Sequence, residues 1–220
     1  MWIHRLTNFF VLGSIKLLAR LFYRVENEWI HRHDGDPWGG VKIVTFLNHT
    51  SLYEPLFLGA IPWRMLWRVA GRIVVPAADI TINRPIVGKI FRAISPRLVP
   101  ISRKRDETWD RFLDEVRDES IVIILPEGRM KRATGLDKKG NRMSVRGGIA
   151  DILELIPNGE MVIIYSGGLH HVQVPGQRIP NLFKHIQIRC EKVSIQEYVN
   201  EMSAIPESNF KRAVIDDMES

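Results

Sequence analysis

The sequence has little cysteine and no long run of uncharged apolar residues. Cys190 is the single cysteine among 220 residues, which excludes an intramolecular disulfide and a cysteine-based metal cluster. We therefore expect a reducing, cytoplasmic setting. The longest uncharged run near the N-terminus, Leu6 to Ile15, is about half of the roughly 20 residues that a bilayer-spanning helix needs. The sequence thus predicts no transmembrane helix in this segment.

Several motifs of common functions are also missing. The sequence has no glycine-rich phosphate loop ending in Lys and Ser or Thr, and no Gly-x-Ser-x-Gly elbow, which argues against nucleotide hydrolysis and serine-ester hydrolysis. It has no recognised nucleic-acid-binding motif either, so we expect no nucleic-acid partner. Nothing in the sequence predicts a bound cofactor or a metal ion.

The composition is that of a globular protein with an anionic partner. The chain is 45% hydrophobic and 25% charged, with a net charge of +6, and its length allows one domain with one core. Residues 63–105 hold ten basic side chains against one acidic side chain, whereas the last twenty residues have a net charge of −3. The first half of the chain should therefore contact an acidic membrane surface or a phosphorylated substrate.

The N-terminal segment predicts a helix in which all the charged side chains are basic and lie on one side. At about 100° per residue, its cations fall within one arc of about 100°. They are Arg5, Lys16, Arg20 and Arg24. We expect residues 1–28 to form a membrane-interfacial helix whose cations meet lipid phosphates. Its aromatic side chains would enter the bilayer: Trp2, Phe9, Phe10 and Phe22. The alternative is an amphipathic helix packed on the core.

The rest of the chain alternates between strand and helix patterns. Strands are predicted at residues 41–47, 98–101, 121–125, 161–165 and 186–190, and helices at 85–94, 106–117, 147–155 and from 194 onward. This alternation predicts an α/β fold, a single domain with a mostly parallel central sheet flanked by helices. Polar motifs follow the strands at 41–47 and 121–125, so we expect the site at the carboxyl ends of the strands.

His49 and Glu54 are the candidate base and its partner. On an ideal helix these positions would be about 140° apart, so the two side chains can meet only if the segment begins as a loop. In that case Glu54 would fix the imidazole tautomer and stabilise the imidazolium that forms when His49 removes a hydroxyl proton.

The motifs, taken together, resemble those of the glycerolipid acyltransferases, which include the lysophosphatidic acid acyltransferases. Asn48, His49 and Ser51 match the first motif of that family, with Glu54 in place of its Asp. Pro126-Glu127-Gly128 matches the third motif, although Arg129 follows directly where the family has Thr. Arg103 resembles the arginine of the second motif, and Arg146-Gly147-Gly148 resembles a later glycine turn. The resemblance covers about residues 40 to 170.

This resemblance implies an O-acyltransferase domain over residues 29–220. With the N-terminal segment and the reducing setting, we expect a peripheral protein at the cytoplasmic face of a membrane. His49 would take the proton of a lysophospholipid hydroxyl, and the oxygen would attack the thioester of acyl-CoA or of acylated acyl carrier protein. Lysophosphatidic acid would give phosphatidic acid. The implied substrate-binding residues are Asn48, Ser51, Arg103, Glu127, Gly128 and Arg129. Two alternatives stay open: another acceptor such as lipid A or an ornithine lipid, and a catalytically silent membrane-lipid-binding module.

Two structural details decide how well this resemblance applies. Glu54 is one methylene, about 1.5 Å, longer than Asp, so the backbone must compensate or the pair no longer works. The depth of the acyl pocket should depend on the packing of Trp63, Met65 and Trp67.

Overall fold

The computed structural model describes residues 2–32, 34–85, 87–102, 105–174, 177, 179–206 and 208–220, so that Arg103 lies outside the described residues. Its helices are α1 (Trp2–Phe22), the 3-10 helix η1 (Glu54–Gly59), α2 (Trp63–Val69), α3 (Asp79–Ile82), α4 (Val87–Ile94), α5 (Glu107–Asp114), α6 (Gly148–Leu155), α7 (Ile195–Ser203) and α8 (Phe210–Glu219). Its strands are β1 (Arg24–Trp29), β2 (Val41–Leu47), β3 (Ile73–Ala78), β4 (Arg97–Ile101), β5 (Ile121–Ile124), β6 (Glu160–Ser166) and β7 (His185–Ser194).

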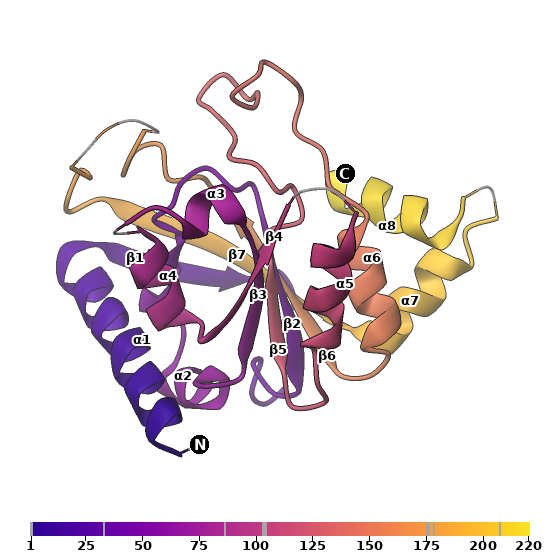
Figure 1. The fold of residues 1–220 in the computed structure, drawn as a ribbon, viewed down its shortest axis with the longest axis horizontal. Coiled ribbons are helices and arrows are strands. Elements are labelled where there is room, and N and C mark those ends of the chain that lie inside the picture. Colours follow the sequence, from indigo (N-terminus) through magenta and orange to yellow (C-terminus); the bar gives the residue numbers. More distant parts are fainter. Residues whose placement is uncertain are drawn as a thin grey trace.

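The strands form one seven-stranded sheet in the order β1-β7-β6-β2-β5-β3-β4. Neighbouring strands are parallel except β6 and β7, which are antiparallel. The predicted α/β class with a mostly parallel sheet is therefore confirmed. Helices lie on both sides of the sheet, α1 and α2 on one side and α5 to α8 on the other (Figure 1).

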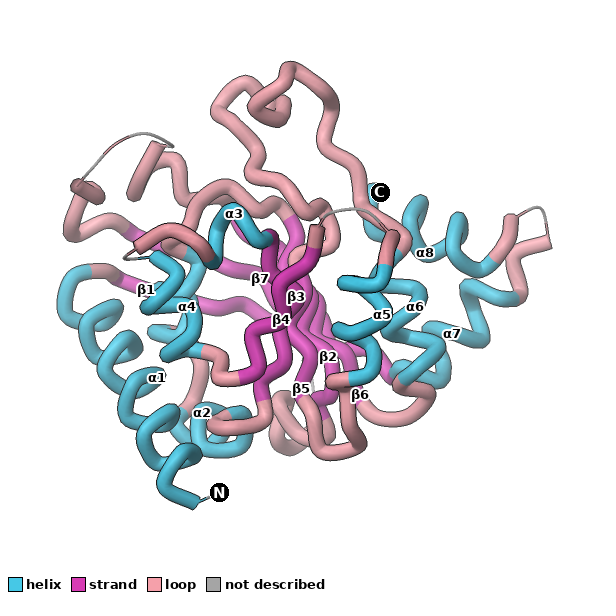
Figure 2. Tube along the Cα trace, in the orientation of Figure 1, coloured by secondary structure: helices cyan, strands magenta, loops and turns pink. Residues whose placement is uncertain are grey.

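The central strands are buried on both faces, which explains their continuous apolar runs. In β2, Val44 packs into the core under α1 and α2, while Ile43 packs into the core under α5 to α8. In β6, Val162 packs into the core under α1 and α2, and Ile163 packs into the core under α5 to α8. The carboxyl ends of β2 and β5 are neighbours in this sheet, so the two polar motifs that follow them are brought together. Figure 2 shows loops gathered along this edge of the sheet.

Arg5 and Lys16 of α1 face the protein, so the expectation that these two cations meet lipid phosphates is wrong, whereas Arg20 is exposed. Lys16 is only 1% exposed, and its ammonium group donates to the carbonyl oxygens of Gly59 at 2.9 Å and Ile61 at 2.6 Å. Arg20 also donates to the Gly59 oxygen, and Arg5 donates to the carbonyl of Trp67. Gly59 is the last residue of η1, Ile61 follows it, and Trp67 lies in the last turn of α2, and carbonyl oxygens at the ends of helices attract cations. The sequence predicts that the cations lie on one side of the helix, but it does not predict the protein surface against which this side packs.

The face of α1 that points away from the protein is mainly apolar. Its exposed large hydrophobic residues are Trp2, Ile3, Phe10, Leu17, Leu18 and Leu21. Phe9 instead packs against Trp63 and Trp67, and Phe22 against Phe183. In the described part of the chain, no helix has the length and hydropathy needed to cross a membrane.

The N-terminal helix ends before the predicted boundary at residue 28. Residues Arg24–Trp29 form β1, which pairs in parallel with β7 along its whole length. Arg24, expected to continue the cationic stripe, lies on this strand and forms an ion pair with Glu26. Residues Arg24–Trp29 therefore belong to the sheet, and α1 is the helical part of the predicted segment.

Candidate active site

A sharp turn after β2 sets the position of His49. Strand β2 ends at Leu47, and Asn48 adopts the left-handed conformation with φ of 64°. Asparagine tolerates this conformation better than most residues. Its side chain donates to the carbonyl oxygen of Ser166, at the end of β6, at 2.6 Å. Asn48 thus ties the loop to the neighbouring strand, and it is not among the residues that line the pocket.

Glu127 holds the backbone on which His49 sits. One carboxylate oxygen accepts the backbone N–H of Asn48 at 3.0 Å, and the other accepts that of His49 at 2.8 Å. Burial raises the pKa of Glu127, although these two N–H groups oppose the shift. Because both oxygens are occupied and the side chain does not line the pocket, Glu127 lies beneath the histidine. Glu127 therefore holds the histidine backbone in position from outside the pocket.

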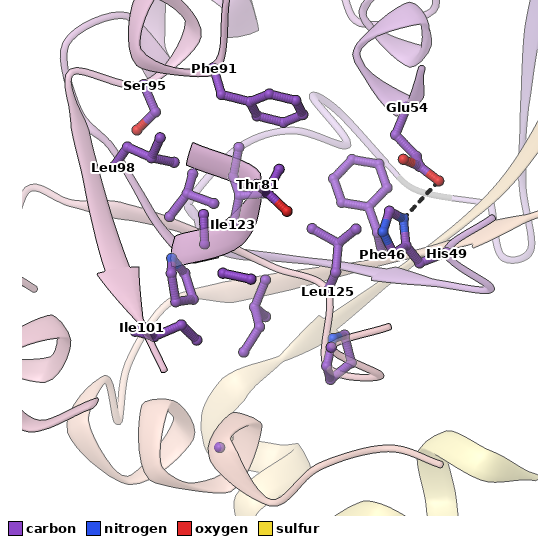
Figure 3. A pocket seen from close by; sticks show the side chains of 18 of the residues that line it. Phe46, His49, Glu54, Thr81, Phe91, Ser95, Leu98, Ile101, Ile123 and Leu125 are labelled. Carbon is purple, nitrogen blue, oxygen red and sulfur yellow. Dashed lines mark ion pairs between the residues drawn. The ribbon is translucent and has the colours of Figure 1, made fainter. Parts of the chain in front are cut away.

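His49 and Glu54 meet because the chain between them is a loop, as the spacing predicts. The Nδ1 atom of His49 lies 2.9 Å from Oε1 of Glu54 (Figure 3), although the ring is not aligned for a linear hydrogen bond. The same oxygen accepts the backbone N–H groups of Thr50 and Ser51, each at 3.1 Å. The longer glutamate is thus accommodated by folding back over the loop, starting from the first residue of η1. Such pairs commonly align fully only with substrate bound.

Ser51 supports the same loop from inside. It is fully buried, donates to the side-chain oxygen of Gln173 at 3.0 Å, and accepts the backbone N–H of Tyr53. The structure therefore places this predicted substrate-binding residue in the packing of the histidine loop.

A pocket of about 430 Å³ begins at His49 and runs between the sheet and helices α3 and α4. Most of the side chains along it are apolar. In Figure 3, Phe46 lies beside His49 and Glu54, while Ser95 and Leu98 lie at the far end. Further lining residues come from four elements: Leu12, Val75, Ile82, Phe91 and Ile94. Trp63, Met65 and Trp67 do not line it, so the expectation that they set its depth is wrong.

The remaining part of the lining is cationic. Its basic side chains are Arg105, Arg129, Arg146 and Lys211, and Gly128 and Asp151 lie among them. Gly128 has a φ of 62°, and a side chain there would crowd Arg146, whose atoms lie 3.3 Å from the position of the added carbon. The turn after β5 therefore needs glycine both for its conformation and for the arginine that crosses it.

Arg129 is held in place by a buried carboxylate. It forms an ion pair with Asp137, in the loop between β5 and α6. The backbone N–H of Asn141 does most to keep the pKa of Asp137 at about 2, together with the N–H of Lys139 and with Arg129. Asp137 is therefore ionised at neutral pH, and Arg129 reaches the pocket as a paired cation.

Four charged residues of the lining were not predicted as site residues: Arg105, Arg146, Asp151 and Lys211. Arg146 belongs to a turn that the sequence motifs do mark. Arg105 stands in a run of three basic residues, in which sequence alone favours no one member. No sequence motif marks Lys211 as a site residue, because its helix follows the last motif only after a long stretch of chain.

The site therefore holds a histidine–carboxylate pair at the head of an apolar pocket, with cations beside it. Comparison with known families defines the class further. The model of the family described as Acyltransferase matches residues 23–166, more than half of the chain. The chain belongs to this acyltransferase family.

A solved structure supports the fold. The crystal structure of the 1-acyl-sn-glycerophosphate (LPA) acyltransferase, PlsC, from Thermotoga maritima is similar over 94% of this chain and 76% of that one. The TM-score is 0.56 and the sequence identity is 16%, a level at which the likeness concerns the fold. No curated protein matches the chain significantly.

Proposed function

We propose that this acyltransferase moves a fatty acyl group from acyl-CoA or acylated acyl carrier protein to the free hydroxyl of lysophosphatidic acid, giving phosphatidic acid. The observation that carries the proposal is the position of His49, which lies where the apolar pocket meets the cationic residues. One substrate of this reaction carries a long acyl chain and the other bears a phosphate. The apolar part of the pocket suits the acyl chain, and the cationic residues suit the phosphate.

The proposed reaction needs no acyl-enzyme. With Nδ1 facing Glu54, Nε2 of His49 takes the proton of the acceptor hydroxyl as its oxygen attacks the thioester carbonyl. The tetrahedral intermediate then collapses, the carbon–sulfur bond breaks, and the imidazolium returns the proton to the leaving thiolate. Glu54 stabilises the imidazolium between these steps, and general-base catalysis of this kind supplies about 10² to 10⁴ in rate.

The acyl chain would occupy the apolar pocket from His49 toward Ser95 and Leu98. Burial of each methylene contributes about 0.8 kcal/mol, so a pocket of about 430 Å³ lined by aliphatic and phenyl groups favours a long chain. The phosphate of the acceptor would lie among the pocket cations, of which Arg129 and Arg146 flank Gly128. Arginine suits this role because its planar fork binds two phosphate oxygens.

The proposed location is the cytoplasmic face of a membrane, to which the protein binds peripherally. The supporting feature is the exposed apolar face of α1, extended by Phe183, which is 76% exposed and contacts Phe22. Arg24 and Lys184 are exposed next to this apolar surface, where they could meet anionic headgroups. The apolar face would therefore enter the interface while these two cations lie at its border.

Acyl transfer to a set of acceptors tests the proposal. The purified protein is incubated with labelled acyl-CoA and either lysophosphatidic acid, monoacylglycerol or lysophosphatidylcholine, and the products are separated by mass spectrometry. We expect lysophosphatidic acid to have the highest kcat/KM, by about tenfold or more, because one charge-assisted phosphate contact contributes about 1.5 to 3 kcal/mol. Equal rates for all three acceptors would rule out phosphate recognition, and no transfer to any of them would rule out the reaction.

A further inference from the structure

Lys211 reaches the active-site pocket from the C-terminal helix. It lies on α8, beyond residue 166, where the match to the family model ends. Its side chain lines the pocket and packs on the backbone of Gly147 so closely that a methyl group on that glycine would lie 1.9 Å from Cε. Gly147 is the N-cap residue of α6, directly before its first residue. The chain at this point is therefore shaped to admit the lysine.

The position of α8 is set by contacts of the residues that follow Lys211 on the helix. Ala213, Val214 and Met218 are buried in the core. At the far end of the helix, the carboxylate of Glu219 accepts the backbone N–H of Val145 at 2.7 Å, in the segment that leads into the Arg146-Gly147-Gly148 turn. The helix is thus anchored to the same segment over which Lys211 lies, so the lysine is held at the pocket.

The partner of Lys211 is shared with another cation. Its ammonium nitrogen lies 3.4 Å from Oδ1 of Asp151, and the same oxygen lies 2.9 Å from a guanidinium nitrogen of Arg105. The other oxygen of Asp151 accepts the indole N–H of Trp109 at 3.0 Å. One carboxylate thus serves two cations, and the lysine has the longer of the two ion pairs.

The charges at this end of the pocket leave an excess of positive charge. Of the four lining cations, Arg129 is paired with Asp137, while Arg105 and Lys211 share Asp151. Asp151 thus neutralises only one of the two cations that it contacts. A phosphate monoester, which carries about −1.5 to −2 at neutral pH, supplies the missing negative charge.

We propose that Lys211 binds a phosphate group of a substrate, so that the C-terminal helix completes the phosphate site of this enzyme. On binding, the ammonium group exchanges its long contact with Asp151 for phosphate oxygens, and Arg105 keeps the carboxylate neutralised. This inference rests on the proposed function. The phosphate belongs either to the acceptor or to the coenzyme A part of the donor, and the kinetic experiment distinguishes these sources.

The test compares two neighbouring cations on α8 in the full-length protein. Lys211→Met removes the pocket lysine, and Arg212→Met removes a cation that is exposed and paired with Asp216. KM is measured for lysophosphatidic acid at saturating acyl-CoA, and for acyl-CoA at saturating lysophosphatidic acid. We expect Lys211→Met to raise one of these KM values by about tenfold with kcat little changed, as loss of one charge-assisted contact would. Arg212→Met should change neither value.

The source of the phosphate follows from which KM rises. A higher KM for lysophosphatidic acid that is absent for monoacylglycerol identifies the acceptor. A higher KM for acyl-CoA that is absent for an acyl-pantetheine without nucleotide phosphates identifies the donor. Lys211→Arg, which keeps the charge, should stay within about threefold of the wild type, so that a larger effect in Lys211→Met comes from the lost charge. Unchanged KM values in Lys211→Met, or an equal effect in Arg212→Met, would overturn the inference.

Binding measured without turnover separates this inference from the proposed function. Lysophosphatidic acid and coenzyme A are each titrated into wild type and Lys211→Met by isothermal titration calorimetry. If the wild type binds one of them about tenfold tighter than the variant but transfers no acyl group, the inference that Lys211 binds phosphate is supported. The proposed acyl transfer is then wrong. If wild type and variant bind both compounds equally, the lysine site is wrong whatever the activity.

Discussion

The two sides of the pocket differ in chemistry and in origin. The side formed by α1, α3 and α4 contributes Leu12, Ile82, Phe91 and Ile94, all apolar. The side formed by the β5–α6 loop and by α8 contributes Arg129, Arg146 and Lys211, all cationic. His49 lies between them, at the carboxyl end of β2. One site thus joins a compartment suited to hydrocarbon with one suited to phosphate.

This contrast explains how a small domain can handle an amphiphile. The apolar side can favour a chain by its length, since burial increases with each methylene, but it has few groups with which to distinguish headgroups. The cationic side can select a phosphate but gains nothing from chain length. Changing one side should therefore leave the selectivity of the other side intact.

The largest effect is expected at the junction of the two sides. His49→Ala removes the base, and we expect kcat to fall by about 10² to 10⁴ with the KM values of both substrates little changed. Steady-state acyl transfer to lysophosphatidic acid measures this effect. His171→Ala, at an exposed histidine outside the pocket, is the control and should keep full activity. A His49→Ala enzyme with wild-type kcat would remove the base from the account.

The next largest effect on kcat is expected at Glu127, which holds the backbone of His49. Glu127→Gln leaves one of the two N–H groups of Asn48 and His49 without an acceptor, so the histidine loop shifts. We expect kcat to fall by about 10 to 100-fold, because small displacements of a catalytic group are costly, while the choice of acyl chain and acceptor stays as in the wild type. Glu119→Gln, at an exposed position just before β5, should have no effect. If Glu127 instead bound the phosphate, KM for lysophosphatidic acid would change and kcat would not.

A smaller and more selective effect is expected on the apolar side. Leu98→Trp fills the end of the pocket away from His49, so long acyl chains should fit less well. We expect the kcat/KM ratio of a 16-carbon to an 8-carbon acyl-CoA to fall by about tenfold, of the order that two lost methylene burials give. Competition between the two donors in one reaction measures this ratio directly, and the short donor serves as the internal control. An unchanged ratio would mean that the chain lies elsewhere.

An effect of similar size, on membrane binding and not on turnover, is expected outside the pocket. Leu18→Ser and Phe183→Ser together remove apolar area from the proposed membrane face, and we expect binding to phosphatidylglycerol vesicles to weaken by about tenfold. Sedimentation with the vesicles measures binding, while turnover of water-soluble short-chain substrates should be unchanged. Leu155→Ser, at an exposed leucine at the end of α6, is the control. Equal losses in both variants would show that this face has no special role.

The sequence predicts most of this fold, because the central strands are buried on both faces and read as continuous apolar runs. It does not reveal β1, whose Arg24, Glu26 and Glu28 are typical of an exposed edge strand. Nor does it reveal β3, which contains Pro76 within the strand, a residue that argues against one. In both cases the pairing partner, far away in the sequence, decides the structure.

For the site, the sequence identifies several of the residues but not the role of each one. The pairing of His49 with Glu54 follows from their spacing once a loop is assumed. The task of Glu127 depends on β2 and β5 being neighbours, which no local pattern contains. The inward direction of Lys16 depends on carbonyl groups more than forty residues away. Periodicity identifies a face of a helix, and only the packing of distant segments decides what covers it.

Photo-crosslinking of the acyl chain tests the central claim most directly. An acyl-CoA with a diazirine at the end of its chain is bound to the wild-type protein and irradiated, and the labelled residues are identified by mass spectrometry. The account predicts labels on the segment from Phe91 to Leu98, on the apolar side of the pocket. Labels on Arg105, Asp151 or Lys211, or on the outer face of α1 alone, would contradict it.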